Sequence, residues 1–337
     1  MARTPVPAAS TPRLDVARLT VIRPPFLVTA ILALALLVVF GELPGRPLIL
    51  HVVQKLGHPS VFGVIALGIL VLARQRPAPA SGPAIDYLAA FAIAVTIGAL
   101  TELGQIFTHR DPSLRDVGLD ARGAAAALAL AAAFDVRCRP GRFAPQWRAL
   151  YLGAALVLLA IILTPLAWTL AGYTLRSHRF PALFVPATRL DLLFVSGVGG
   201  RIERFALPAA QARTAGETAL RVPLIARPYA GVSLDEPAPD WRGYATLVVE
   251  LTNPGRSDLA LSVRVHDRAH DSTYADRFNS EVTVPAGRRE VLEFPVAAIR
   301  DAPRGRSIDL AHIANLQLFR AGPDGPREFW LHRIELR

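Results

Sequence analysis

The chain has 337 residues, 52% of them hydrophobic, with a mean hydropathy of +0.35 and a formal net charge of +10. This composition is too apolar for an ordinary soluble protein, and the length suits two domains. Residues 176–337 hold 22 arginines against 19 acidic residues, so most of the excess positive charge lies in the first half, beside apolar runs. That placement is typical of membrane topology signals and argues against a nucleic-acid partner.

The first half of the chain is predicted to be a membrane domain. Residues 1–24 are rich in proline and alanine, and we expect a disordered cytoplasmic N-terminus there. Residues 25–173 are predicted to form an α-helical bundle of five transmembrane helices, since ~20 apolar residues cross a ~30 Å hydrocarbon core. The five spans are predicted at residues 25–41, 59–73, 85–107, 118–136 and 149–173.

The basic residues between the spans predict the orientation. Ten arginines lie on the side of the N-terminus and five basic residues on the other side. The positive-inside rule then places the N-terminus in the cytoplasm and the residues after 173 outside. We expect a multi-pass protein of the inner (cytoplasmic) membrane, surrounded by membrane lipids, with a periplasmic C-terminal domain.

A set of polar residues is predicted to converge at the outer ends of the spans. Lys55 is the single lysine among 37 basic residues, which indicates a need for a compact ammonium or, equally, chance retention. Ionisable groups at the rim of a span are costly and usually face the bundle interior or a watery cavity. The set comprises Lys55, His58, Glu102, Gln105, Arg110, Arg115, Asp116 and Asp120.

These side chains support several kinds of chemistry. His58 with Glu102 or Asp116 is a candidate catalytic acid–base group. The candidates for binding a phosphate-bearing head group are Lys55, Gln105, Arg110, Arg115 and Asp120. The carboxylates with His58 also suit a hard divalent cation. A salt-bridge network that locks the helices together is equally consistent with the pattern.

The order of these residues resembles the VanZ-like membrane family over residues 25–140. The resemblance rests on K-x-x-H at Lys55, E-x-x-Q at Glu102, an arginine, D-x-x-x-D at Asp116, and Gly123. Pro59, where an aromatic residue is common, departs from the pattern, as does Asp120, where asparagine is common. The resemblance implies an envelope membrane protein linked to glycopeptide tolerance or envelope polysaccharide metabolism, and it supplies no reaction.

The second half is predicted to be an all-β jelly-roll sandwich. Residues 174–195 are predicted as a linker, and residues 196–337 carry short alternating segments separated by turn signals. A single cysteine, Cys138, leaves no intramolecular disulfide, so this domain needs its own core. The predicted strands are 202–205, 247–253, 259–267, 281–287, 289–296, 315–322 and 329–337.

The stretch Y-x-D-R-F-N at Tyr274, with D-W-x-G-Y at Asp240 and V-x-D-x-x-H at Val265, resembles galactose-binding-like sandwiches of the carbohydrate-binding-module kind. The resemblance implies glycan binding, because aromatic faces stack on sugars and polar side chains reach hydroxyls. The candidate glycan-binding residues are Asp267, His270, Tyr274, Asp276, Arg277 and Asn279.

Structural roles compete with the glycan-binding roles. Trp241 and Tyr244 are interpreted mainly as core residues, and Asp276 with Arg277 can equally tie a loop to a strand end. The resemblance also implies a structural calcium ion, for which Glu203 and Glu335 are the candidate ligands.

Three functions remain open from the sequence. The leading hypothesis is a membrane protein that binds a glycan or a lipid-linked glycan head group at the outer leaflet. The second is a transferase or hydrolase acting on such a head group, with His58 and a carboxylate as acid and base. The third is a structural scaffold that binds another envelope protein.

Overall fold

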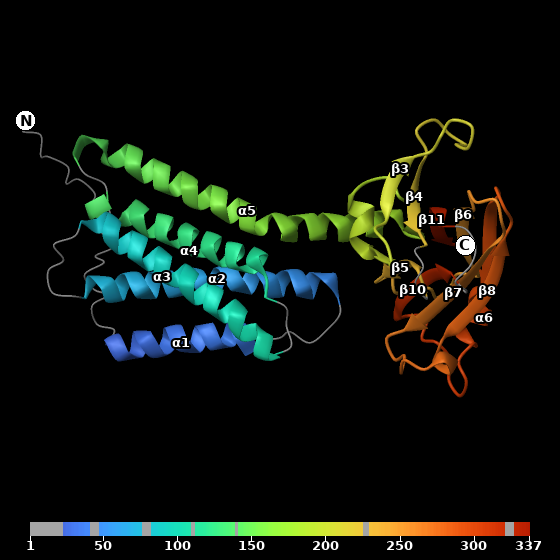
Figure 1. Cartoon of the computed structure of the whole chain (residues 1–337), viewed down its shortest axis with the longest axis horizontal. Coiled ribbons are helices and arrows are strands. Elements are labelled where there is room, and N and C mark those ends of the chain that lie inside the picture. Colours follow the sequence, from blue (N-terminus) through green and yellow to red (C-terminus); the bar gives the residue numbers. More distant parts are fainter. Residues whose placement is uncertain are drawn as a thin grey trace, which may run out of the picture. The chain divides into compact units, whose positions relative to one another are not determined.

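The computed structural model describes residues 23–40, 47–75, 82–108, 112–138, 141–224, 229–320 and 327–337 (Figure 1). It divides into two compact units, Met1–Ala167 and Trp168–Arg337. Arg110 and nearly all of the predicted disordered segment, residues 1–24, lie outside the described residues.

Each of the five predicted apolar segments corresponds to one α-helix of the structure. The helices are α1 (Pro24–Phe40), α2 (Leu48–Arg74), α3 (Pro83–Gly104), α4 (Leu114–Phe134) and α5 (Ala144–Arg179). Four of them, α2 to α5, are long and apolar enough to cross a membrane, whereas α1 is apolar but shorter. The helical N-terminal region is therefore confirmed, and the count of five spans stays a prediction.

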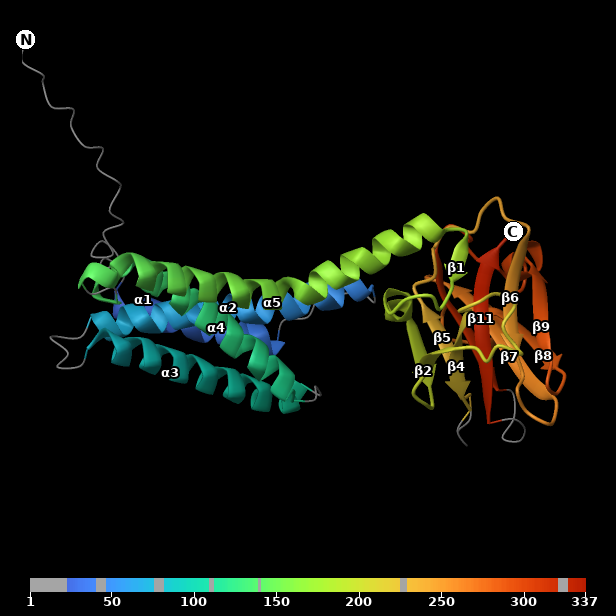
Figure 2. The same ribbon diagram turned by 90° about the horizontal axis from the view of Figure 1, so that it is seen from above.

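Helices α2 and α4 lie side by side (Figures 1 and 2). Glycines at their contact allow the two backbones to approach closely. A Cβ atom on Gly123 would lie 2.0 Å from the carbonyl oxygen of Pro59, so only glycine fits there. A Cβ atom on Gly63 would lie 3.3 Å from the Gly123 carbonyl oxygen. This close approach brings the polar residue before Pro59, His58, up to α4.

The second unit is an all-β sandwich of two antiparallel sheets, which confirms that part of the predicted fold. The six-stranded sheet has the order β3-β4-β11-β6-β9, with β1 paired to β11, and the five-stranded sheet has the order β2-β5-β10-β7-β8. The strands of the first sheet are β1 (Ala182–Phe184), β3 (Glu203–Ala206), β4 (Thr218–Pro223), β6 (Thr246–Thr252), β9 (Arg289–Pro295) and β11 (Glu328–Leu336). The strands of the second sheet are β2 (Val195–Val198), β5 (Gly231–Asp235), β7 (Leu259–Asp267), β8 (Phe278–Val284) and β10 (Ile313–Arg320).

The seven predicted strands correspond to β3 and to β6 through β11, whereas β1, β2, β4 and β5 were not predicted. The segment predicted as a linker, residues 174–195, instead forms the end of α5, strand β1 and a short 3-10 helix, Leu190–Phe194. Strand β1 has only three residues, so no alternation marks it, and it is held by pairing to a strand 150 residues away. Trp241 is fully buried and donates its Nε1–H to the carbonyl of Ala238 at 2.7 Å, in keeping with a core role.

Buried His332 predicts a pH dependence of the sandwich. It lies on β11, with Nε2 2.7 Å from the Thr252 hydroxyl. Burial, and then the positive charge of Arg289, lower the pKa of His332 from 6.5 to about 4. Between these values the unfolded chain binds more protons than the folded one, so the free energy of unfolding falls as the pH drops from 6.5 to 4. The expected loss from this residue is on the order of 3 kcal/mol.

Hydrogen exchange at the amides of β6 and β11, followed by mass spectrometry on the full chain, measures this loss. His332→Gln is expected to flatten the dependence between pH 4 and 6.5. His312→Gln, which changes an exposed histidine of the same unit, is the matched control. An unchanged slope in His332→Gln would contradict the assignment.

Candidate functional site

The outer face of the five-stranded sheet carries a row of polar side chains. Along β7, Val263 and Val265 are buried, whereas Arg264 between them points to the other face because successive side chains alternate. In the register of the sheet, Arg264 lies opposite Gln317 on β10 and Asn279 on β8. Gln317 in turn lies opposite Ser233 on β5. Residues from four neighbouring strands therefore form one row across the sheet.

Aromatic and arginine side chains extend this row at both ends. The Arg264 guanidinium lies 4.7 Å from the ring centre of Phe319, which packs edge-on against Tyr229 at 5.6 Å. At the other end the Arg277 guanidinium lies 5.2 Å from the ring centre of Tyr274. We call this set the arginine–tyrosine strip; its members are Tyr229, Phe319, Arg264, Gln317, Asn279, Arg277 and Tyr274.

The strip holds the guanidinium groups of two arginines, Arg264 and Arg277. Arg264 donates to Gln317 Oε1 at 3.2 Å and Arg277 donates to Asn279 Oδ1 at 3.2 Å. Within the described part of the chain, no carboxylate lies at ion-pair distance from either arginine. The buried Arg264 Nε has no hydrogen-bond partner there. Burial, and secondly the neighbouring charge of Arg277, lower the pKa of Arg264, and a bound anion would offset the repulsion between the two guanidinium groups.

The two tyrosines are the most exposed aromatic residues of the described sandwich. Tyr229 is 63% exposed and Tyr274 is 69% exposed. Such rings offer an apolar face and a polar tip to a ligand. Tyr229 lies just before β5 with φ +63°, a left-handed conformation that is costly outside glycine.

The six residues predicted to bind a glycan divide into two groups. Tyr274, Arg277 and Asn279 lie on the strip. The other three belong to an internal network centred on Arg306, a residue that the sequence patterns did not indicate. Arg306 donates to both oxygens of Asp267, at 2.6 and 2.9 Å.

The second part of this network holds the loop before β8. Arg306 donates to Asp276 through Nε and, at 3.0 Å, through Nη2. His270 Nδ1 lies 2.9 Å from the Asp276 carbonyl oxygen. The hydrogen bonds from Arg306 are the main reason that the pKa of Asp276 lies below its ordinary value. The structure therefore places Asp267, His270 and Asp276 in a structural tie rather than on the exposed face.

Sequence reasoning missed four members of the strip: Tyr229, Arg264, Gln317 and Phe319. The alternation in LALSVRVHD already assigns Arg264 to the solvent side of its strand. Its neighbours were not predictable in the same way, because they depend on the order in which β5, β10, β7 and β8 pair.

In the membrane unit, three of the predicted polar residues meet. The ligand atoms of His58 on α2, Glu102 on α3 and Asp120 on α4 lie within 4.8 Å of one another, and all three residues are buried. His58 Nδ1 lies 3.3 Å from Asp120 Oδ1. Glu102 accepts hydrogen bonds from the Ser113 backbone N–H at 2.8 Å and from Gln105 Nε2 at 3.3 Å. We call His58, Glu102 and Asp120 the buried triad.

The remaining predicted residues of this region lie outside the buried triad. Asp116 is half-buried at the first turn of α4, where its N–H donates to the Ser113 hydroxyl at 3.3 Å. Arg115 and Lys55 are exposed. Among the described residues, Lys55 forms no ion pair and no hydrogen bond. No contact in that part of the chain therefore explains why a lysine, rather than an arginine, stands at this position. Of the two carboxylates predicted as acid–base partners of His58, Glu102 belongs to the triad and Asp116 does not. Asp120, which was predicted to bind a head group, is the second carboxylate beside His58.

The two carboxylates predicted to share a calcium ion lie on different parts of the six-stranded sheet. Glu203 on β3 is in register with Arg221 on β4, which is in register with Trp330 on β11. Glu335 lies five residues further along β11 and accepts hydrogen bonds from Arg337 at 2.6 and 2.7 Å. At about 3.4 Å per residue the two glutamates are separated by more than a shared ion allows. The structure does not bring them together.

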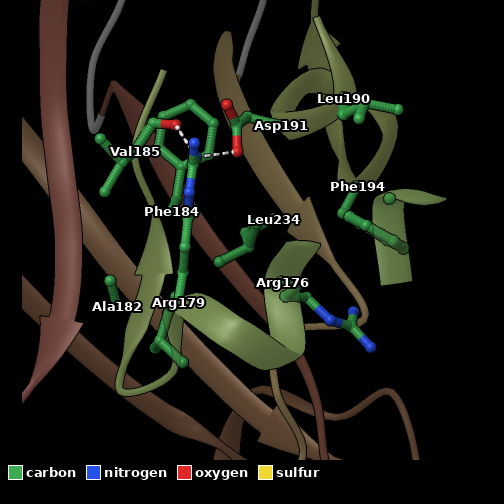
Figure 3. A pocket seen from close by; sticks show the side chains of 11 residues that line it. Arg176, Arg179, Ala182, Phe184, Val185, Leu190, Asp191, Phe194 and Leu234 are labelled. Atoms are coloured by element: carbon green, nitrogen blue, oxygen red, sulfur yellow. Dashed lines mark hydrogen bonds and ion pairs between the residues drawn. The ribbon is translucent and has the colours of Figure 1, made fainter. Parts of the chain in front are cut away.

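A small pocket in the second unit is lined by an ion pair among other residues (Figure 3). Arg179, near the end of α5, pairs with Asp191, and Arg179 Nη1 also lies 3.5 Å from the Val185 carbonyl oxygen. Asp191 further accepts from Thr188 N at 2.6 Å. Arg176, the third charged residue that lines the pocket, donates to the Glu236 carbonyl oxygen. The charged groups of this pocket are therefore engaged by other groups of the protein.

Comparisons with known proteins address the sandwich alone. No family model and no curated protein matches the chain, so the VanZ-like resemblance stays a prediction. A family 11 carbohydrate-binding module from Clostridium thermocellum, in complex with a β-1,3-1,4-mixed-linked tetrasaccharide, is similar at 16% identity and a TM-score of 0.34, over 43% of this chain and 88% of that chain.

Two further solved structures are similar over the same part of the chain. A CBM22-1 xylan-binding domain from Paenibacillus barcinonensis has 16% identity and a TM-score of 0.30, over 42% of this chain and 84% of that chain. An exo-β-agarase has 13% identity and a TM-score of 0.33, over 43% of this chain and 23% of that chain. Similarity at this level concerns the fold alone.

Proposed function

We propose that this chain is an integral membrane protein whose β-sandwich binds a glycan on the arginine–tyrosine strip, and that the glycan carries acidic groups. The single observation that supports this most strongly is the placement of Arg264 and Arg277 between the exposed rings of Tyr229 and Tyr274, with no carboxylate of the described residues at ion-pair distance from either guanidinium group. In keeping with the topology of the basic residues, the sandwich is proposed to face the periplasm.

The strip matches the surface of a sugar chain in three respects. Exposed aromatic faces suit the apolar faces of pyranose rings, and the amides of Gln317 and Asn279 suit hydroxyl groups. The side chains lie in a row across neighbouring strands, which suits an extended ligand. A guanidinium fork binds a carboxylate or a sulfate with paired, charge-assisted hydrogen bonds, so the two arginines favour an acidic saccharide over a neutral one.

Titration of the full chain in detergent with a panel of neutral, uronate-containing and sulfated oligosaccharides tests the proposal. We expect at least one acidic saccharide to bind and Tyr274→Ala and Tyr229→Ala each to weaken that binding, since each removes a stacking face. Isothermal titration calorimetry gives the affinity and the stoichiometry.

Val291→Ala is the matched control, because Val291 is 40% exposed and lies on β9 of the other sheet. If neither tyrosine change weakens binding, the saccharide binds at a site other than the arginine–tyrosine strip. A folded protein that binds no saccharide of the panel would favour the scaffold hypothesis, in which the sandwich contacts another envelope protein.

A further inference from the structure

The buried triad differs from the other charged cluster of the membrane unit. Near the ends of α2 and α4 opposite to the triad, buried Asp135 receives hydrogen bonds from Arg74 and, at 3.0 Å, from the Arg137 backbone N–H. Its charge is therefore neutralised by arginine side chains. That cluster is an ion-pair lock of the kind that stabilises a bundle.

The triad contains two carboxylates, Glu102 and Asp120, and one imidazole, that of His58. Among the residues that the structure describes, neither carboxylate has a lysine or an arginine within ion-pair distance. Asp120 is 0% exposed, and neither of its carboxylate oxygens accepts a hydrogen bond. His58 Nδ1 lies 3.3 Å from Asp120 Oδ1, which makes an ion pair when the imidazole is protonated, and it has no hydrogen-bond partner in the described part of the chain.

A buried carboxylate without a partner is strongly unfavourable, and it is stabilised either by taking up a proton or by binding a cation. Each of the three side chains presents a ligand atom toward the others, from three different helices. The hydrogen bonds that Glu102 accepts from Ser113 and Gln105 orient its carboxylate, as outer-shell partners do around metal ions. The oxygens of Asp120 and the Nδ1 of His58 retain their lone pairs for coordination.

From these observations we propose that His58, Glu102 and Asp120 form a binding site for a divalent transition-metal ion. One imidazole and two carboxylates suit borderline cations such as Zn²⁺, because calcium and magnesium prefer oxygen ligands alone. Three protein ligands leave at least one coordination position for an oxygen atom of a small ligand. The proposal is independent of glycan binding by the sandwich.

Purified full-length protein without a histidine tag, stripped of metal and then titrated with ZnCl₂ in detergent, tests the site. We expect one Zn²⁺ per chain, measured by elemental analysis after gel filtration. Asp120→Asn is expected to weaken Zn²⁺ binding by more than the ~10- to 100-fold that loss of an outer-shell partner costs. Substitution with Co²⁺ gives a visible spectrum of the wild-type protein that reports nitrogen and oxygen ligands without any variant.

The matched control is Asp271→Asn. Asp271, with His270 and Asp276, belongs to the second described group of residues whose ligand atoms approach one another closely, and Asp271 is exposed. Zn²⁺ binding that survives Asp120→Asn, or that is lost in Asp271→Asn, overturns the proposal. A folded wild-type protein that takes up neither Zn²⁺ nor Co²⁺ overturns it as well. His58→Gln, which keeps a polar side chain of similar size, provides a second variant if Asp120→Asn does not fold.

Discussion

Replacing Arg264 with methionine is expected to weaken binding of an acidic saccharide by about 10- to 100-fold, because a hydrogen bond to a charged group contributes about 1.5–3 kcal/mol. Methionine keeps an unbranched side chain over Phe319, so the packing of the sheet face is retained while the charge is lost. Binding of the same saccharide to the wild-type protein should also fall as the salt concentration rises. Calorimetric titration at two ionic strengths measures both effects.

The control for this prediction is Arg256→Met. Arg256 is exposed in the turn between β6 and β7, so this change removes the same net charge away from the strip. An equal loss of affinity in both variants would mean that general electrostatic attraction, rather than a contact with Arg264, governs binding. Unchanged affinity in Arg264→Met would contradict the acidic-glycan proposal.

Replacing Arg306 with methionine is expected to destabilise the sandwich by about 3 kcal/mol, the low end of the cost of leaving a buried charge unpaired. The Asp267 side chain is fully buried and is held by both Nη atoms of Arg306. Burial opposes ionisation of this carboxyl, but the hydrogen bonds from Arg306 and from the Asp309 N–H prevail, and the pKa of Asp267 lies below its ordinary value. Hydrogen exchange of the β7 and β8 amides reports the change.

Arg242→Met tests whether loss of any arginine–aspartate pair destabilises the sandwich. Arg242 and Asp240 form an equally short pair on the surface, at 2.7 Å, where screening makes such pairs weak, so stability should be almost unchanged. Adding Asp267→Asn to Arg306→Met should recover part of the loss, since the buried charge is then removed. If Arg306→Met instead reduced glycan affinity at full stability, Asp267 and Asp276 would return to the binding site as the sequence predicted.

Local patterns predicted the elements that depend on neighbouring residues. The apolar runs became helices α1 to α5, and period-two alternation located β6 through β11 and β3. Strands β1, β2, β4 and β5 were not predicted because they are short or carry few alternating residues. Their pairing with strands distant in the sequence stabilises them. Residues 174–195 were predicted as a linker for the same reason, since β1 is short and depends on pairing with β11.

The candidate sites show which facts only the tertiary structure decided. The sequence by itself determined that His58, Glu102 and two aspartates would lie at one end of a helical bundle. It also determined that the Arg264 side chain would point to the solvent side of its strand. The rotation of α4 decided that Asp120, rather than Asp116, meets His58. The register of β7 with β8 and β10 decided that Arg264 meets Asn279 and Gln317, because helix rotation and strand pairing depend on contacts between residues far apart in the chain.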